Sequence, residues 1–241
     1  MSKSLKLFLG ISYIIILLVF LYLIFSYIEV TRLDDFLYYK ELQIYLENTI
    51  SKNLYINLLA FSLFCIIWVS LLGFGSPLLL ISGILFGKWI GTFISLFSIS
   101  IGALTLYSIA NFFFKDLVKN LLEKKFSKYI YLFRKNEFNY FLAFRLAGGL
   151  GIPFGLQNVL PVIFNIGKSN YFFASFLGFI PMFYIWNTIG AGLNKYIKQV
   201  DDFSFVNLFL NKDIYLPLIL FVVIMLISVV IKKRIFDDKN L

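Results

Sequence analysis

Long runs without a charged residue alternate with short charged stretches along the whole chain. The uncharged runs cover residues 7–28, 53–87, 89–114, 146–167, 169–194 and 214–231. A helix that crosses a bilayer needs about 20 predominantly apolar residues, so several of these runs are long enough to cross. The pattern predicts an all-α fold in a polytopic membrane protein.

The run at 53–87 is too long for one straight membrane helix. At about 1.5 Å per residue it would be much longer than the roughly 30 Å hydrocarbon core. Gly73 and Gly75 relax the backbone in its middle, and Pro77 lacks an N–H and clashes with a preceding helical turn. We therefore expect a helix followed by a re-entrant hairpin near 73–88.

A second interruption lies near 139–167, where a charge and helix breakers occur in apolar sequence. Arg145 is followed by several glycines, among them Gly151, and by Pro153 and Pro161, which do not allow a regular helix of spanning length. Non-helical backbone at membrane depth is tolerated only where protein or a water-filled cavity satisfies its polar groups. We therefore expect a second re-entrant hairpin that meets the first inside the helix bundle.

The basic segment at 115–138 determines the expected topology. It carries seven Lys or Arg and three Asp or Glu, with apolar residues at helical spacing. This pattern predicts a helix lying on the membrane surface, and a solvated linker helix is the alternative. Because bases favour the cytoplasmic side, this segment and the basic residues 232–234 should lie inside. One crossing at 89–114 then separates the hairpins, so they enter from opposite faces, as inverted repeats do.

A short internal similarity agrees with two equivalent halves. Gly75-Ser-Pro77 and Gly151-Ile-Pro153 are each followed by a glycine 25 residues after the proline. The expected domains are an N-terminal transmembrane helix with an extramembrane segment (1–54), a membrane domain with both hairpins (55–195), and a C-terminal loop, helix and basic tail (196–241). We interpret the run at 7–28 as a retained helix, because it exceeds the roughly 7 to 15 residues of a signal core. The side of the N-terminus stays open.

Composition narrows the function. Of 241 residues 60% are hydrophobic and 15% charged, and the chain has no histidine and one cysteine, Cys65. The missing histidine removes the commonest acid–base group and metal ligand, so we expect neither an enzyme nor a metal or other cofactor. The net charge of +9 indicates an anionic partner. In so apolar a chain this partner is membrane lipid rather than nucleic acid.

Several short motifs resemble a known family. They are Gly-x-Leu-Phe-Gly at 83–87, a helix of small residues after it, Arg145, and a Pro-Phe followed by Gln157 and Asn158. In this order they are similar to the DedA superfamily, specifically its SNARE-associated Golgi protein branch, which carries the VTT domain. The resemblance covers roughly residues 55–195.

The resemblance implies two opposed re-entrant hairpins and a role in moving lipids, including phospholipids and polyprenyl-phosphate carriers. The chain departs from the family in two places. After Tyr107 it has Asn111 where the family usually has an arginine, which weakens the case for a two-arginine headgroup clamp. The run at 53–87 has no acidic residue, so a carboxylate proton relay lacks support.

Arg145 is the leading candidate for the site. A guanidinium in apolar surroundings should be paired, face a cavity or reach the interface. It either binds a phosphate with bidentate geometry or extends to the membrane surface. The other candidates for the substrate path are neutral amides, which could instead tie the hairpins to neighbouring helices: Gln157, Asn158, Asn165 and Asn111. The residues expected to shape the hairpins are Pro77, Gly83, Gly87, Gly151 and Pro153.

These observations favour a lipid transporter or scramblase in a bacterial plasma membrane that moves anionic headgroups of phospholipids or polyprenyl phosphates. A secondary transporter of a small anion and a non-transporting membrane scaffold are the alternatives. An intramembrane hydrolase ranks last, because no histidine or embedded carboxylate is available as a base. The lipid or solute, the coupling ion, the physiological role and the oligomeric state stay open.

Overall fold

A computed structural model describes residues 36–72 and 75–231, together with isolated positions between 8 and 22. The helix expected at 7–28 therefore lies largely outside the described residues. The same holds for Gly73 and for the basic tail at 232–234.

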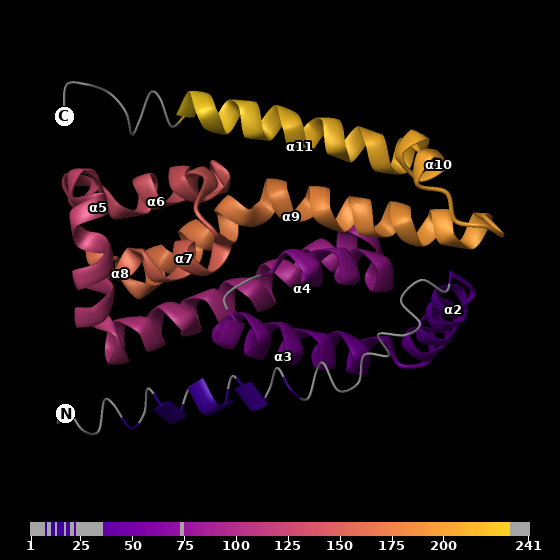
Figure 1. Ribbon diagram of the computed structural model, residues 1–241, viewed down its shortest axis with the longest axis horizontal. Helices are drawn as coiled ribbons and strands as arrows, with labels where there is room; N and C mark the ends of the chain where they lie inside the picture. Colours follow the sequence, from indigo (N-terminus) through magenta and orange to yellow (C-terminus); the bar gives the residue numbers. More distant parts are fainter. Residues whose placement is uncertain are drawn as a thin grey trace.

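The described residues are 91% helical and form no strand, so the predicted all-α fold is confirmed for this part of the chain. Its elements are α2 (Phe36–Lys52), α3 (Leu54–Leu72), α4 (Ser76–Phe113), α5 (Lys115–Lys135), α6 (Glu137–Leu146), η2 (Gly148–Gly151), α7 (Phe154–Val159), α8 (Pro161–Phe164), α9 (Lys168–Gln199), α10 (Phe205–Leu210) and α11 (Lys212–Ile231) (Figure 1). Within the described residues α3, α4, α9 and α11 are long and apolar enough to cross a membrane. By helix length and composition, this confirms the prediction of a polytopic all-helical membrane protein.

The chain folds back twice in its first half. The rings of Phe61 and Phe86 lie 5.3 Å apart, so α3 and residues 76–86 run side by side in opposite directions. Gly87 then has φ 74° and ψ 175°, which ends the helical path. The Ser82 hydroxyl donates to the Gly91 carbonyl at 3.1 Å, although residues nine apart on a straight helix would be about 13 Å apart. Residues 88–113 therefore return along 76–86.

We call α3 together with 76–86 the first hairpin. The sequence predicts a complete helix followed by a short hairpin, whereas α3 itself is the first arm. Pro77 lies in the first turn of α4, where a missing N–H costs no helical bond, and its role in shaping the hairpin stays a prediction. Gly83 lies inside a regular helix, and its importance is packing: a Cβ there would be 2.3 Å from the Asn187 carbonyl oxygen.

The second hairpin consists of α6, the tip at 147–153, and α7 with α8. The tip is irregular, since positive φ angles occur at all four residues of η2: 60°, 72°, 56° and 80°. Pro153 caps the start of α7. In Figure 1, α6 starts beside α5 and reaches the middle of the molecule, and α7 and α8 return toward α5. The first hairpin starts at the other end, beside α2.

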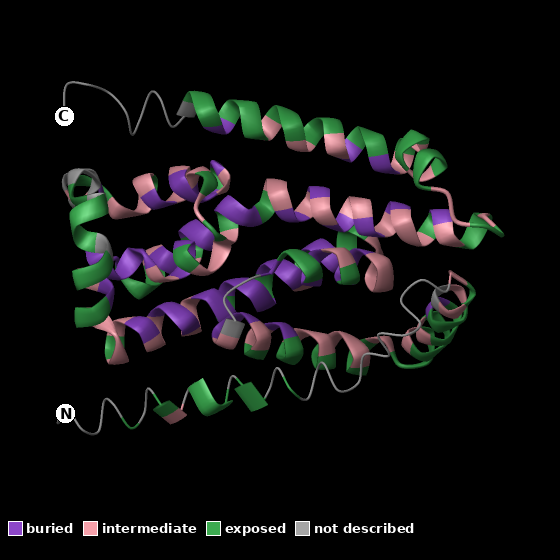
Figure 2. Ribbon diagram, in the orientation of Figure 1, coloured by how far each residue is buried: buried purple, intermediate pink, exposed green. Residues whose placement is uncertain are grey.

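The two long helices α4 and α9 form the centre of the bundle. Buried residues concentrate on α4, α7, α8 and α9, whereas α3 and α11 expose apolar outer surfaces (Figure 2). Close backbone contact is achieved at glycines: a Cβ at Gly190 would lie 2.3 Å from the Leu80 carbonyl oxygen. An apolar outer surface of this kind is the one that lipid chains cover in a membrane.

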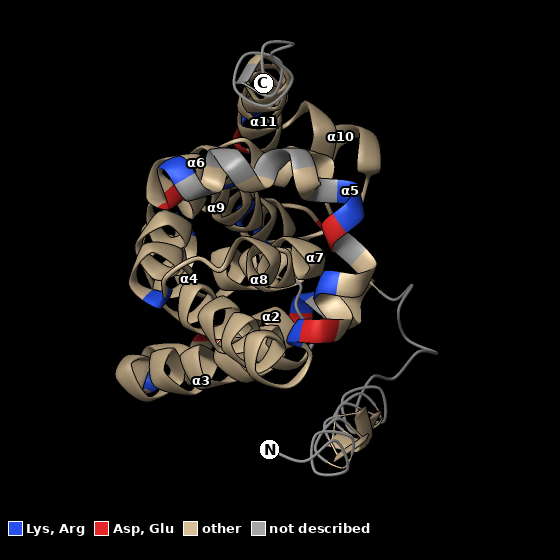
Figure 3. Cartoon of the chain, turned by 90° about the vertical axis from the view of Figure 1, so that its left-hand side faces the viewer, with Lys and Arg blue, Asp and Glu red and all other residues tan. Residues whose placement is uncertain are grey.

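α5 crosses one end of the bundle at a steep angle to the long helices (Figure 1). Its buried side includes Val118 and Phe133, and the Phe133 ring stacks on Phe164 at 4.0 Å. Figure 3 shows charged residues of α5 and of the start of α6 gathered at this end. The expected amphipathic helix is present, and its position on a membrane surface stays a prediction.

Candidate functional site

Arg145 is enclosed at the centre of the second hairpin, with 2% of the residue exposed. Its Nε donates to the Ser175 hydroxyl at 3.2 Å, and one terminal nitrogen donates to Gln157 Oε1 at 3.3 Å. The other terminal nitrogen donates to Asn158 Oδ1 at 2.8 Å and to the Tyr171 hydroxyl at 2.9 Å. The side chain thus turns into the protein rather than toward its surface.

Aromatic rings surround the guanidinium on several sides. The centroids of Phe141 and Phe179 each lie 4.7 Å from its central carbon. Tyr171 follows at 5.4 Å and Phe154 at 6.0 Å. Ring faces attract a cation, and they also exclude the water that would otherwise screen it.

All four hydrogen-bond partners of Arg145 are neutral. In the part of the chain that the structure describes, no carboxylate pairs with it. Neutral dipoles and rings lower the cost of a buried cation, but they leave the net charge uncompensated. A bound anion would supply the missing charge.

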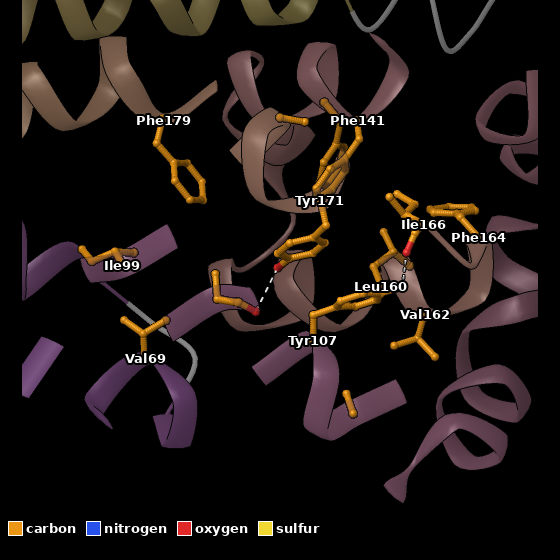
Figure 4. Close-up of a cluster of buried hydrophobic side chains, with 14 of the residues drawn as sticks. Val69, Ile99, Tyr107, Phe141, Leu160, Val162, Phe164, Ile166, Tyr171 and Phe179 are labelled. Atoms are coloured by element: carbon orange, nitrogen blue, oxygen red, sulfur yellow. Dashed lines mark hydrogen bonds between the residues drawn. The ribbon is translucent and has the colours of Figure 1, made fainter. Parts of the chain in front are cut away.

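The site is held by a second layer of contacts (Figure 4). Tyr171 lies between Phe141 and Tyr107, and the two tyrosine rings stack 4.6 Å apart. The Tyr107 hydroxyl donates to the Ile166 carbonyl at 2.5 Å, and the Tyr171 hydroxyl donates to the Ala103 carbonyl at 3.2 Å. These bonds connect the second hairpin and α9 to α4.

The irregular tip is held by Gln157. Its Nε2 donates to the carbonyls of Gly148 at 3.2 Å and Ile152 at 2.6 Å. Gln157 therefore satisfies tip carbonyls with one end and accepts from Arg145 with the other.

A cavity of about 270 Å³ lies beside Arg145. It is lined by residues of both hairpins (Gly75, Ser76, Leu79, Arg145, Gly148, Phe154 and Gln157), of α9 (Phe179, Met182, Phe183 and Trp186) and of α11 (Phe221 and Met225). The two hairpin tips thus meet at one space, which is polar near Arg145 and apolar elsewhere.

The structure brings three of the five candidate residues together: Arg145, Gln157 and Asn158. Asn165 is instead an exposed left-handed cap at the end of α8, and its Oδ1 accepts from Lys115 at 3.4 Å. Asn111 lies near the end of α4, and no described residue hydrogen-bonds to its buried Oδ1. Neither of these two asparagines hydrogen-bonds Arg145, and their roles stay predictions.

Sequence reasoning missed the aromatic and hydroxyl partners of Arg145. Tyr171, Ser175 and Phe179 are spaced four apart on α9, so they share one face of the helix. That spacing of a tyrosine and a serine in an apolar helix was the available signal.

Membrane-length apolar helices and a charged site enclosed among them define an integral membrane protein with an internal polar site. Residues 73–192 match the family model of the VTT domain, the domain of the DedA and SNARE-associated Golgi protein family. The chain therefore carries a VTT domain, and the resemblance seen in the sequence is confirmed. Proteins of this family are generally similar to membrane transporters rather than to enzymes. No curated protein and no solved structure matches the chain.

Proposed function

We propose that the protein is a lipid transporter or scramblase that carries anionic headgroups across a bacterial plasma membrane. The observation that carries the proposal is the uncompensated charge of Arg145, buried beside a cavity that both hairpins line. Four of the five guanidinium N–H groups already donate to protein acceptors, so a phosphate would pair with the charge of Arg145 and accept the N–H that remains, on the nitrogen that also donates to Gln157. A polar path of this kind lowers the free energy needed to move a charged headgroup through hydrocarbon.

The proposal includes two re-entrant hairpins related as an inverted repeat. Its support is that they begin at opposite ends of the molecule (Figure 1). Positions 76 residues apart also correspond: Gly75 and Gly151, Pro77 and Pro153, Gly102 and Gly178.

Contacts that the two hairpins make are also related by the offset of 76 residues. A Cβ at Gly102 would meet the side chain of Val69, and a Cβ at Gly178 would meet that of Arg145. Arg145 thus occupies in the second hairpin the place that apolar Val69 occupies in the first. The transport site in this proposal is consequently asymmetric, with one arginine.

A lipid fits the cavity better than a small soluble anion. Apart from Arg145 and Gln157, the walls are mainly aromatic rings and methionine or leucine side chains. Such walls would bind the apolar part of an amphiphile, whereas a free inorganic anion would gain nothing from them.

The test is lipid movement in vesicles that contain the purified protein. We expect a fluorescent phosphatidylglycerol to change leaflet in wild-type vesicles. Arg145→Gln should slow it at least about tenfold, since a hydrogen bond to a charged group contributes about 1.5 to 3 kcal/mol. Lys168→Gln removes the same charge from an exposed position and should leave the rate unchanged. An Arg145→Gln protein that elutes as a folded species and moves lipid at the wild-type rate overturns the proposal. Uptake of phosphate without lipid movement would favour the small-anion transporter instead.

A further inference from the structure

One wall of the cavity comes from outside the VTT domain. The family match ends at residue 192, whereas Phe221 and Met225 of α11 line the cavity. The Phe221 ring meets Trp186 of α9 edge to face, with the centroids 5.7 Å apart. α11 therefore adds to the site a surface that the family assignment does not include.

At its first turn α11 contacts α9 through an ion pair and a close approach of the backbone. Lys195 and Asp213 form an ion pair at 2.6 Å, and a Cβ at Gly192 would lie 2.5 Å from the Asp213 carbonyl oxygen. Farther along, the described face of α11 toward the bundle is mainly apolar and includes Pro217 and Phe221. Apolar contacts are not directional, so this part of the contact between α9 and α11 can adapt to an apolar ligand.

The cavity reaches the flank of the molecule beside α11. Met225 lines it and is also 46% exposed. The neighbouring exposed residues Val222 and Leu226 are apolar, so this flank is one that lipid chains would cover. Charged residues lie instead toward the two ends of the bundle, on α5 and the start of α6 (Figure 3) and on α2, the end of α9 and the start of α11.

We propose that the seam between α9 and α11 holds the apolar chain of the amphiphile whose phosphate pairs with Arg145. This inference rests on the proposed function and names the part of the site that recognises the chain. Trp186, Phe221 and Met225 contact the chain, and the flexible Met225 adapts to chains of different shape. The substrate class is an anionic phospholipid or polyprenyl phosphate that enters sideways from the bilayer, with its chain still in contact with the membrane.

Photolabelling tests chain binding without requiring transport. The purified protein in detergent is equilibrated with a few equivalents of phosphatidylglycerol that carries a diazirine in one acyl chain, illuminated, and mapped by mass spectrometry. We expect label at Phe221 and Met225 that falls about tenfold in Arg145→Gln, because the headgroup contact positions the chain. Label on the outward residues Leu226, Ile227, Val229 and Val230 should be the same in both proteins. Equal label at Met225 in both proteins, or label confined to the outward residues, overturns the inference.

A transport measurement supplies a second readout. Phe221→Ala removes part of the wall and so enlarges the space for the chain. Leu226→Ala removes a similar apolar volume from a residue that is 63% exposed. With two phosphatidylglycerols that differ only in chain branching, we expect Phe221→Ala to favour the branched probe about fivefold more than wild type does. Leu226→Ala should not change the ratio. If folded Phe221→Ala shows the wild-type ratio of branched to unbranched transport, the chain-binding inference is wrong but the lipid-transport proposal is unaffected. If the seam is labelled but no lipid moves, the transport proposal alone is wrong.

Discussion

Arg145 shows how neutral groups can hold a charge inside an apolar protein. An amide, a second amide, a serine hydroxyl and a tyrosine hydroxyl accept its hydrogen bonds. The phenylalanine rings beside it add cation–π attraction. None of these groups cancels the charge, and the proposed binding of an anion rests on this feature.

Loss of the Tyr171 hydroxyl should test most clearly whether the neutral partners of Arg145 stabilise the protein. Tyr171→Phe keeps the ring that stacks on Tyr107 but removes the hydroxyl that joins Arg145 to the Ala103 carbonyl. We expect the free energy of unfolding to fall by about 1 to 3 kcal/mol, because buried hydrogen-bonding groups lose their partner. Thermal unfolding in detergent measures this, with Tyr215→Phe, at a residue 40% exposed, as the matched control. Equal stability of the two variants would contradict the role assigned to Tyr171.

The sequence identifies the charged and amide members of the site but not its aromatic members. Arg145, Gln157 and Asn158 stand out because they interrupt apolar sequence. Tyr171 does not, since tyrosine is common in membrane helices and its partner depends on tertiary packing. That packing is determined by Gly178, where a Cβ would lie 2.4 Å from the Arg145 Cβ. The four-residue spacing of Tyr171 and Ser175 shows that they share a face of α9, but it does not show that this face packs on Arg145.

At the scale of elements, glycines determine where the helices turn and how closely they approach. Gly87 makes the sharp turn after the first hairpin, and Gly83 and Gly190 allow backbones to touch. The sequence predicts both interruptions correctly because glycine and proline cluster there. It does not reveal which residue turns the chain, since Pro77 begins a helix and Gly87 ends one.

Gly87→Ala tests the turn. Its φ of 74° and ψ of 175° belong to a region that is essentially restricted to glycine. We expect a loss of about 1 to 3 kcal/mol in unfolding free energy from backbone strain, even though no atom lies within 4 Å of the added Cβ. Lys88→Ala, at the exposed neighbouring position, should have almost no effect in the same melting experiment. A Gly87→Ala protein as stable as Lys88→Ala would show that the turn is not required.

At the scale of the molecule, two hairpins that start at opposite ends meet around one cavity (Figure 1). The glycine and proline interruptions, together with the bias of basic residues, predict two hairpins that enter from opposite faces, and their relation as re-entrant inverted repeats stays a proposal. The participation of α11 in the cavity could not be predicted, because its apolar sequence is equally suited to plain lipid contact.

Substituted cysteines report which end faces which side of the membrane. Lys88→Cys and Lys168→Cys place exposed thiols just after the first and second hairpins, while native Cys65 is 0% exposed and should stay unlabelled. If residues 88–113 cross once and the second hairpin returns to its starting side, a membrane-impermeant maleimide should label the two positions from opposite sides. Labelling of both from one side would mean that residues 137–164 cross the bilayer instead of folding back.

The most direct measurement of the central claim is lipid movement by Asn158→Asp. The substitution is nearly isosteric and places a carboxylate where the Arg145 nitrogen now donates at 2.8 Å, so it supplies the missing negative charge within the protein. We predict a protein that melts no lower than wild type but moves phosphatidylglycerol at least about tenfold more slowly, because the arginine no longer needs an external anion. A folded Asn158→Asp protein that moves phosphatidylglycerol at the wild-type rate would contradict the account.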